Sequence, residues 1–325
     1  MKNFIKVSKL KLSNKVTFFL SLVFLALAIY YLSNEINTSI NSFIQVTSKI
    51  SLLSLIIPLL AVFLLQFLNW FFEALKFKIL FQTSQSITLK SILKSIYVGN
   101  FTAFFTPERL GNFVGRALVL KKNKKEVIAT TLIGNLGQLI ITVVVGLLSM
   151  LMLRSYLFKK LLHFDYFQIL PLLLYFSLLV ALMILYFNTK SIRLFSKFRF
   201  FEKWMGEIKG INNIKFSVKL YALSFALLRY FVFYFQYLIL AKAIHLDLDF
   251  ISLFAYVGVL FGLVTFIPSP LPGNLGTREG LALFLFGGGI FGIQFSLISF
   301  IVWLINVGFS TIFGGIVYSY SYLKK

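Results

Sequence analysis

Phe266-Ile-Pro-Ser-Pro-Leu-Pro-Gly-Asn-Leu-Gly-Thr-Arg-Glu279 is the stretch that decides how this chain can fold. It holds three of the six prolines and lies between two apolar runs, 251–266 and 281–295. Because proline removes a backbone donor and glycine adds conformational freedom, we expect no continuous helix to cross it. The residues expected to break the helix are Pro268, Pro270, Pro272, Gly273 and Gly276.

The same stretch carries the polar residues Asn274, Arg278 and Glu279. Each charge at membrane depth costs about 2.5–3.5 kcal/mol on insertion scales, and such charges usually mark a site. Broken backbone at that depth is tolerated only where protein or a water-filled cavity satisfies it. The stretch is therefore a candidate binding site. Two alternatives remain: a polar loop between two spans, and an Arg278–Glu279 pair that only locks the turn.

The composition predicts an all-α polytopic membrane protein. The 325 residues are 59% hydrophobic and 13% charged, whereas soluble domains are nearer half apolar and a quarter charged. At about 20 residues per span the length suits six to eight spans. We expect a single membrane domain over residues 1–325, with spans at 16–33, 50–72, 126–153, 166–187, 219–244 and 291–320.

The net charge of +22 comes from cations that lie between the apolar runs. Such cations orient the chain and face anionic headgroups, so we expect no nucleic-acid partner. The basic tail 1–15 and the basic loop 188–219 predict a cell (inner) membrane protein with both termini in the cytoplasm. Cysteine is absent, and His163 and His245 form no ligand cluster, so neither a metal nor a cofactor is expected.

Three polar features lie within the predicted spans. Glu73 and Lys76 are three residues apart and can pair on one helical face, which we interpret as an interfacial salt bridge rather than part of a transport path. Gln138 fits helix packing, with a cavity-lining role as the alternative. Arg229, near the centre of its span, needs an inward-facing acid or amide.

A second broken stretch lies at 87–120. A helix from about 89 to 105 should end before Pro107, and Pro107 suits the first position of a new helix. From there Glu108, Asn112 and Arg116 share one face at three- and four-residue steps, which gives a polar stripe next to Arg109. Gly111 is expected to contribute to this break.

The two stretches form an internal repeat. Tyr97-Val-Gly99 precedes the first and Tyr256-Val-Gly258 precedes the second, and the spacing Pro-x-x-x-Gly recurs in both. If 89–120 and 251–290 enter from opposite sides as re-entrant hairpins, six full crossings leave every lysine cluster on one side. Inverted repeats place such broken tips near the midplane, where helix N-termini at Pro107 and Pro272 would favour an anionic headgroup.

At these residues the chain resembles the lysylphosphatidylglycerol synthase transmembrane region family, also called flippase-like domain proteins. Its pattern Pro-x-Arg-x-Gly-Glu-x-x-x-Arg is similar to Pro107-Glu-Arg109-Leu-Gly111-Asn112-Phe-Val-Gly115-Arg116. Its pattern Pro-x-Pro-Gly-Gly-Leu-Gly-x-Arg-Glu is similar to Pro270-Leu-Pro272-Gly-Asn274-Leu-Gly276-Thr-Arg278-Glu279. This chain has Asn112 in place of the usual acid and Asn274 in place of a glycine, so charge at the first tip is reduced or carried by Glu108.

The resemblance implies a membrane domain that binds or moves a lipid. Some family members are fused to a soluble aminoacyl-transfer domain. Because this chain ends five residues after its last predicted span, we expect a stand-alone member without synthase activity.

We therefore expect translocation of a membrane lipid with an anionic headgroup, with Arg229 as a possible counter-ion. The candidate substrate-binding residues are Glu108, Arg109, Asn112, Arg116, Arg229, Asn274, Arg278 and Glu279. Alternatives are a small-solute or ion-coupled secondary transporter, an enzyme acting on a lipid-linked substrate, and a non-transporting partner of a biosynthetic enzyme. Without a nucleophile–base pair or paired carboxylates on one loop, an enzyme is not expected. The sequence leaves the oligomeric state open.

Overall fold

The computed structural model describes the backbone of residues 44, 48, 51–81, 87–106, 109–120, 124–154, 156, 169–188, 214–267, 272–287 and 289–323. Within these ranges the chain is helical and forms no strand, which confirms the all-α prediction. Several sequence predictions fall outside the described residues. They are the tail 1–15, the span 16–33, most of the loop 188–219, and Pro107, Glu108, Pro268 and Pro270.

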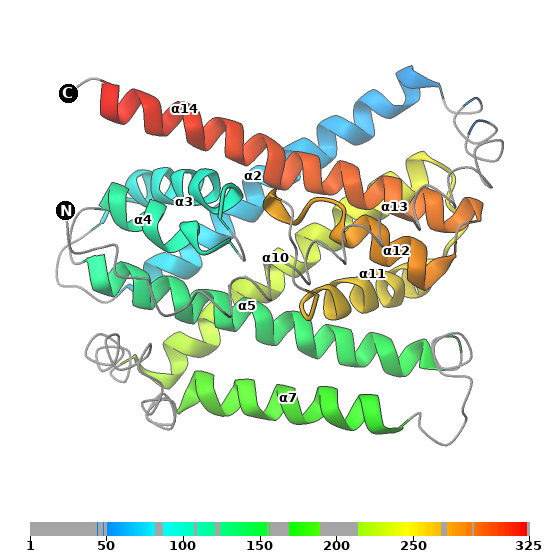
Figure 1. The fold of residues 1–325 in the computed structure, drawn as a ribbon, viewed down its shortest axis with the longest axis horizontal. Helices are drawn as coiled ribbons and strands as arrows, with labels where there is room; N and C mark the ends of the chain where they lie inside the picture. The colour runs from blue at the N-terminus through cyan, green and yellow to red at the C-terminus, as the bar shows by residue number, and fades with distance from the viewer. Residues whose placement is uncertain are drawn as a thin grey trace, which may run out of the picture.

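Figure 1 shows the helices coloured in chain order. They are α2 (Leu52–Leu80), α3 (Leu89–Phe104), α4 (Gly111–Leu120), α5 (Lys124–Met152), α7 (Ile169–Phe187), α10 (Phe216–Ala243), α11 (Phe250–Val264), the 3-10 turn η4 (Pro272–Asn274), α12 (Thr277–Phe286), α13 (Ile290–Trp303), the π-helical segment η5 (Leu304–Phe309) and α14 (Ser310–Leu323).

Within the described ranges, four helical segments are long and apolar enough to cross a membrane. They are Leu53–Leu80, Glu126–Met152, Phe216–Ala243 and Ile290–Tyr320. Each matches a predicted span, and α7 coincides with the span predicted at 166–187. Figure 1 shows α5, α7 and the combined α13–α14 helix running close to the long axis of the molecule, with α2 and α10 crossing it obliquely. The chain is therefore a multi-pass helical membrane protein.

Helix α2 buries several polar side chains and exposes several apolar ones. The buried polar residues are Gln66, Asn69, Glu73 and Lys76. The exposed apolar residues include Leu53, Ile57, Leu60 and Leu64. A soluble bundle would reverse this arrangement, whereas lipid accepts apolar side chains and ionisable residues in a membrane face the bundle interior. This face of α2 is therefore suited to lipid contact.

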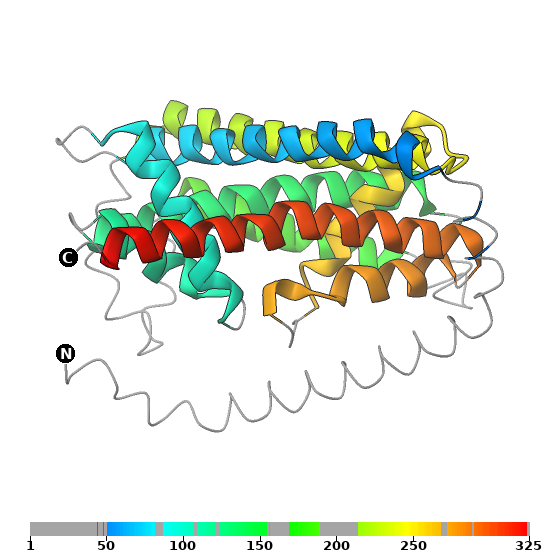
Figure 2. The ribbon, with the colours of Figure 1, turned by 90° about the horizontal axis from the view of Figure 1, so that it is seen from above.

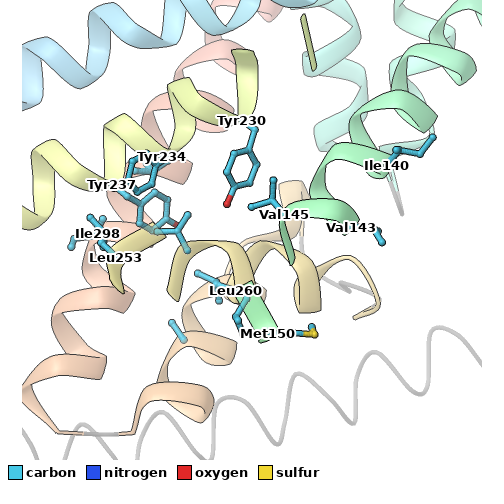
Figure 3. Packing of buried hydrophobic residues seen from close by; sticks show 14 of the residues in the cluster. Ile140, Val143, Val145, Met150, Tyr230, Tyr234, Tyr237, Leu253, Leu260 and Ile298 are labelled. Carbon is cyan, nitrogen blue, oxygen red and sulfur yellow. The ribbon is translucent and has the colours of Figure 1, made fainter. Parts of the chain in front are cut away.

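Two apolar clusters stabilise the helical packing. The larger is built from α5, α10, α11 and α13, and Figure 3 shows Tyr230 and Tyr237 pointing from α10 into it, with Leu260 and Ile298 among its members. The smaller lies around α3 and α4 and contains Trp70 from α2. Polar residues between the two clusters form the site described below.

The two broken stretches adopt a similar backbone. Arg109 and Asn274 each lie two residues after the proline of their motif, and both have positive φ, 57° and 61°. Few residues other than glycine adopt this left-handed conformation, although asparagine tolerates it. Gly276, with φ of 77°, precedes α12, as the matching Gly111 begins α4.

The α-helices begin later than predicted: Pro107 lies outside the described residues, and Pro272 begins the 3-10 turn η4 rather than an α-helix. Helix α4 begins at Gly111, and α12 begins at Thr277. The positive-φ residues in each turn keep the backbone out of the helical region, so each helix starts four or five residues after the proline. The rule that favours proline at the first helical position is overridden by the turn.

The two turns meet in space. The turn η4 contacts α3, and a Cβ placed on Gly273 would lie 2.9 Å from the Phe104 ring. On its other side, the Trp303 indole Nε1 donates to the Gly273 carbonyl oxygen at 2.7 Å. Figure 2 shows the α3–α4 turn and η4 facing each other across the middle of the molecule. The two motifs, whose matching residues Arg109 and Asn274 are 165 positions apart in the chain, are thereby brought to one place.

The repeated Tyr-Val-Gly sequence supplies a close helix approach in each half. A Cβ on Gly99 would lie 2.6 Å from Oδ1 of Asn112 on α4, and one on Gly258 would lie 2.8 Å from the Ser149 Cβ on α5. Neither site has room for a side chain. Small residues at such crossings let helices pack closely in a membrane.

Candidate functional site

A cavity of about 440 Å³ lies between the two apolar clusters. Its aromatic lining includes Trp70 from the smaller cluster and Tyr230 from the larger, together with Phe233 and Phe261. Its charged and amide lining residues are Glu73, Asn100, Arg109, Asn112, Arg116, Asn135, Gln138, Arg229, Arg278 and Asn306. An apolar wall with a few convergent polar groups is the usual form of a small-ligand site.

Glu73 on α2 organises the charges around this cavity. Its carboxylate accepts from Nη2 of Arg116 at 2.9 Å through Oε1, and from Nη1 of Arg229 through Oε2. Lys76 Nζ lies 2.6 Å from the same Oε2. The predicted Glu73–Lys76 pair is confirmed. Its interpretation as an interfacial salt bridge is wrong, because both side chains are at most 3% exposed and Glu73 also holds two arginines.

Arg229 on α10 has the acid and the amides that its position demands. Its Nε donates to Asn69 Oδ1 at 2.9 Å, and its Nη1 donates to Gln138 Oε1 at 3.2 Å as well as to Glu73. The guanidinium carbon lies 5.4 Å from the centre of the Trp70 ring, which suits a cation–π contact. The prediction of an inward-facing partner for Arg229 is confirmed, and Gln138 lines the cavity.

Two further groups of hydrogen bonds fix the surrounding side chains. Arg116 Nε donates to Asn112 Oδ1 at 2.9 Å within α4. Asn69 Nδ2 donates to Asn306 Oδ1 at 3.2 Å, and Asn306 Nδ2 donates to Gln236 Oε1 at 2.8 Å. Asn306 lies in the π-helical segment η5, and such segments often occur at functional sites. The network therefore joins α2, α10 and η5.

Arg109 and Arg278 make fewer polar contacts than Arg116 and Arg229 do. Arg109 Nη2 reaches Asn100 Oδ1 only at a long 3.5 Å. Arg278 lies over the Phe261 ring, with its guanidinium carbon 5.6 Å from the ring centre. Among the residues described, neither arginine forms an ion pair. Both line the cavity, one from each broken stretch.

The remaining predicted site residues are placed differently. Asn274 and Glu279 do not line this cavity, and Glu108 lies outside the described residues. Glu279 is only 7% exposed, and neither carboxylate oxygen has a hydrogen-bond partner in the part of the chain described. The alternative in which Arg278 and Glu279 lock the turn by an ion pair finds no support, because no such pair forms between these two described residues.

The sequence reasoning missed Asn69, Asn100 and Asn306, and it gave Glu73 the wrong role. One signal was available for α2, because Gln66, Asn69, Glu73 and Lys76 follow steps of three, four and three residues. Such spacing puts them on one helical face. For Asn306 the only signal in the sequence was a single amide within an apolar span. No set of three or more acids and histidines that could hold a metal occurs among the described residues.

Comparison with known proteins gives one match. The model of a family described as the lysylphosphatidylglycerol synthase TM region matches residues 18–314. This range includes the cavity and both broken stretches. Neither a curated protein nor a solved structure matches the chain.

Proposed function

Since the chain belongs to the lysylphosphatidylglycerol synthase TM region family, we propose that it binds an anionic lipid headgroup in the arginine-lined cavity and translocates that lipid across the bilayer. The proposed location is the cell membrane, with both termini in the cytoplasm. No catalytic step and no cofactor form part of this proposal.

The observation that carries the proposal is the convergence of four arginines on one cavity. Arg109, Arg116, Arg229 and Arg278 come from four different segments, and Glu73 is the carboxylate that faces them among the described lining residues. The guanidinium fork matches carboxylate and phosphate groups through paired hydrogen bonds. An anion in the cavity would compensate charge that the protein itself leaves unbalanced.

Helix lengths support the two re-entrant hairpins. Helices α3 and α4 have 16 and 10 residues, so at 1.5 Å per residue they span about 24 Å and about 15 Å. Helices α11 and α12 have 15 and 10 residues. A bilayer core is about 30 Å thick. We propose that both pairs dip in and return, which gives six crossings and an inverted repeat.

The surroundings of the cavity suit a headgroup whose tails stay in lipid. A volume of about 440 Å³ is the size of a small-ligand site, too small to enclose two acyl chains as well. Exposed apolar side chains cover the outer faces of several long helices, including Phe231 and Phe235 on α10. Lipid tails can remain against such faces while the headgroup occupies the polar interior.

A scrambling assay in liposomes tests the proposal. The purified protein is reconstituted with fluorescent phosphatidylglycerol, and loss of signal after external quenching reports movement between leaflets. We expect Arg109→Gln to slow movement at least about tenfold, because it removes charge-assisted hydrogen bonds to the headgroup, each of which contributes about 1.5–3 kcal/mol. The matched control is Arg154→Gln, at an exposed position beyond α5.

Equal rates for Arg109→Gln, Arg116→Gln and wild type would overturn the proposal. Accelerated flux of a small anion through sealed liposomes, without lipid movement, would favour the solute transporter instead. Copurification of a biosynthetic enzyme, with no lipid or solute movement, would favour the non-transporting partner.

A further inference from the structure

The cavity has a large excess of positive charge. Its described lining holds four arginines and one carboxylate, Glu73. The described lining therefore has an excess of three positive charges, and Lys76 shares the Glu73 carboxylate with two of the arginines. Counting Glu108, whose position is not described, would still leave an excess of two. Uncompensated charge of this size is costly away from water.

Several donor atoms around the cavity are free. Arg116 and Asn100 are each 2% exposed, and Arg116 Nη1 and Asn100 Nδ2 have no hydrogen-bond partner among the described residues. Arg109 makes one long bond, and Arg278 makes a ring contact. By contrast, Arg229 is held by Asn69, Glu73 and Gln138.

The free donors divide the site into two parts. Glu73 and the amides hold Arg229 through Nε and Nη1, so we assign it to the fixed part of the wall. Arg109, Arg116 and Arg278 line the same cavity with donor capacity to spare, and Asn100 adds an amide. Buried polar groups are normally satisfied, so an unsatisfied set at a cavity points to a ligand.

The number of charges indicates the ligand class. A phosphodiester such as phosphatidylglycerol carries one negative charge, and it would leave most of the excess uncompensated. A phosphate monoester has a second pKa near 6 and three acceptor oxygens at higher pH, and a diphosphate carries more charge still. Three arginine forks around one cavity match several acceptor oxygens better than they match the two of a diester.

We propose that the ligand of this cavity carries at least two negative charges, as a phosphate monoester or a diphosphate, and that Arg109, Arg116, Arg278 and Asn100 bind it. This inference deepens the proposed function and rests on it for the lipid nature of the ligand. The same chemistry occurs in a free anion, and the experiment separates the two sources.

Binding is measured on the purified full-length protein in detergent at pH 8, by ligand-dependent thermal stability. The probes are phosphatidic acid, phosphatidylglycerol and inorganic pyrophosphate. We expect phosphatidic acid to bind at least about tenfold more tightly than phosphatidylglycerol, because each charge-assisted hydrogen bond contributes enough for a factor of ten. If pyrophosphate stabilises the protein and neither lipid does, the requirement for at least two negative charges stands, and the ligand is a soluble anion rather than a lipid.

Arg109→Gln and Arg278→Gln are the test variants, and Arg154→Gln is the matched control. Each test variant should lose most of the preference for phosphatidic acid. Its stability without ligand should be unchanged or higher, because each removes a cation that has no ion-pair partner among the described residues. The control should keep both the preference and the stability.

Equal affinity of the wild type for phosphatidic acid and phosphatidylglycerol would overturn the inference, and that comparison needs no variant to fold. Full preference in both test variants would also overturn their assigned role. Preference for phosphatidic acid without any lipid movement would overturn translocation and leave the charge requirement standing. Movement of both lipids, with equal affinity for the two, would support translocation and overturn the charge requirement.

Discussion

Arg116 and Arg229 share a single carboxylate, with Nη2 of Arg116 2.9 Å from Oε1 of Glu73 and Nη1 of Arg229 bound to Oε2. The three residues belong to α4, α10 and α2, so one acid ties together helices that are 43 and 156 positions away along the chain. All three side chains are buried, and Glu73 is the carboxylate among the described residues that line the cavity.

Glu73→Gln should therefore destabilise the protein strongly. The substitution leaves Lys76, Arg116 and Arg229 without their shared anion, and breaking a buried ion pair from one side costs about 3–5 kcal/mol. Thermal unfolding in detergent measures the change. Asp247→Asn, the same chemical change at an exposed position, is the control. A Glu73 variant as stable as that control would contradict the central role of this carboxylate.

Lys76→Met should be far milder. Glu73 keeps Arg116 and Arg229 as partners, so the substitution leaves no buried charge unpaired and removes one cation from an interior with an excess of positive charge. We expect a loss of less than about 1 kcal/mol in the same unfolding assay. A loss as large as that of Glu73→Gln would show that Lys76 is essential to the network.

Gly115→Ala should separate α3 from α4. A Cβ on Gly115 would lie 2.7 Å from the Val98 carbonyl oxygen and 2.8 Å from the Gly99 Cα, both of which are backbone atoms that cannot rotate away. We expect a loss of about 1–3 kcal/mol, the usual cost of overpacking. Gly289→Ala is the matched control, since nothing lies within 4 Å of its Cβ. Equal stability of the two variants would refute the close approach.

Glu279→Gln distinguishes a functional carboxyl group from a structural one. Since neither oxygen is hydrogen-bonded to a described residue, we expect stability to change by less than about 1 kcal/mol. If Glu279 belongs to the translocation path, lipid movement in liposomes should nevertheless fall at least about tenfold. Normal lipid movement would exclude Glu279 from the translocation path, in agreement with its absence from the cavity lining.

Asp249 should make stability depend on pH at the start of α11. Hydrogen bonds from the Ser252 side chain and backbone, and from the Ile251 backbone, hold the pKa of Asp249 below its ordinary value of 3.8. A lowered pKa means that the stabilisation is present above the ordinary value and is lost as the pH falls through the folded-state value. Asp249→Ala should therefore lower the melting temperature at pH 7 and have less effect near pH 3.

The sequence was informative where the physics is local. Proline and glycine spacing located both interruptions, and the burial of a lone cation at Arg229 required a polar partner. It was uninformative where the partner comes from distant packing, because Glu73 and Lys76 satisfy each other locally and gave no sign of Arg116. The helix starts were missed for a similar reason, since left-handed residues such as Arg109 delay helix formation beyond the proline.

The shared carboxylate also constrains the order of assembly during synthesis. Glu73 and Lys76 are made first, and α4 follows with Arg116 before α5 is complete. Arg229 emerges later and meets an acid that is already engaged, so α10 completes a partly built interior. If α4 entered the lipid alone, Arg116 would lie there without its partner Glu73. Insertion of this protein therefore favours delivery of α2, α3 and α4 as one group.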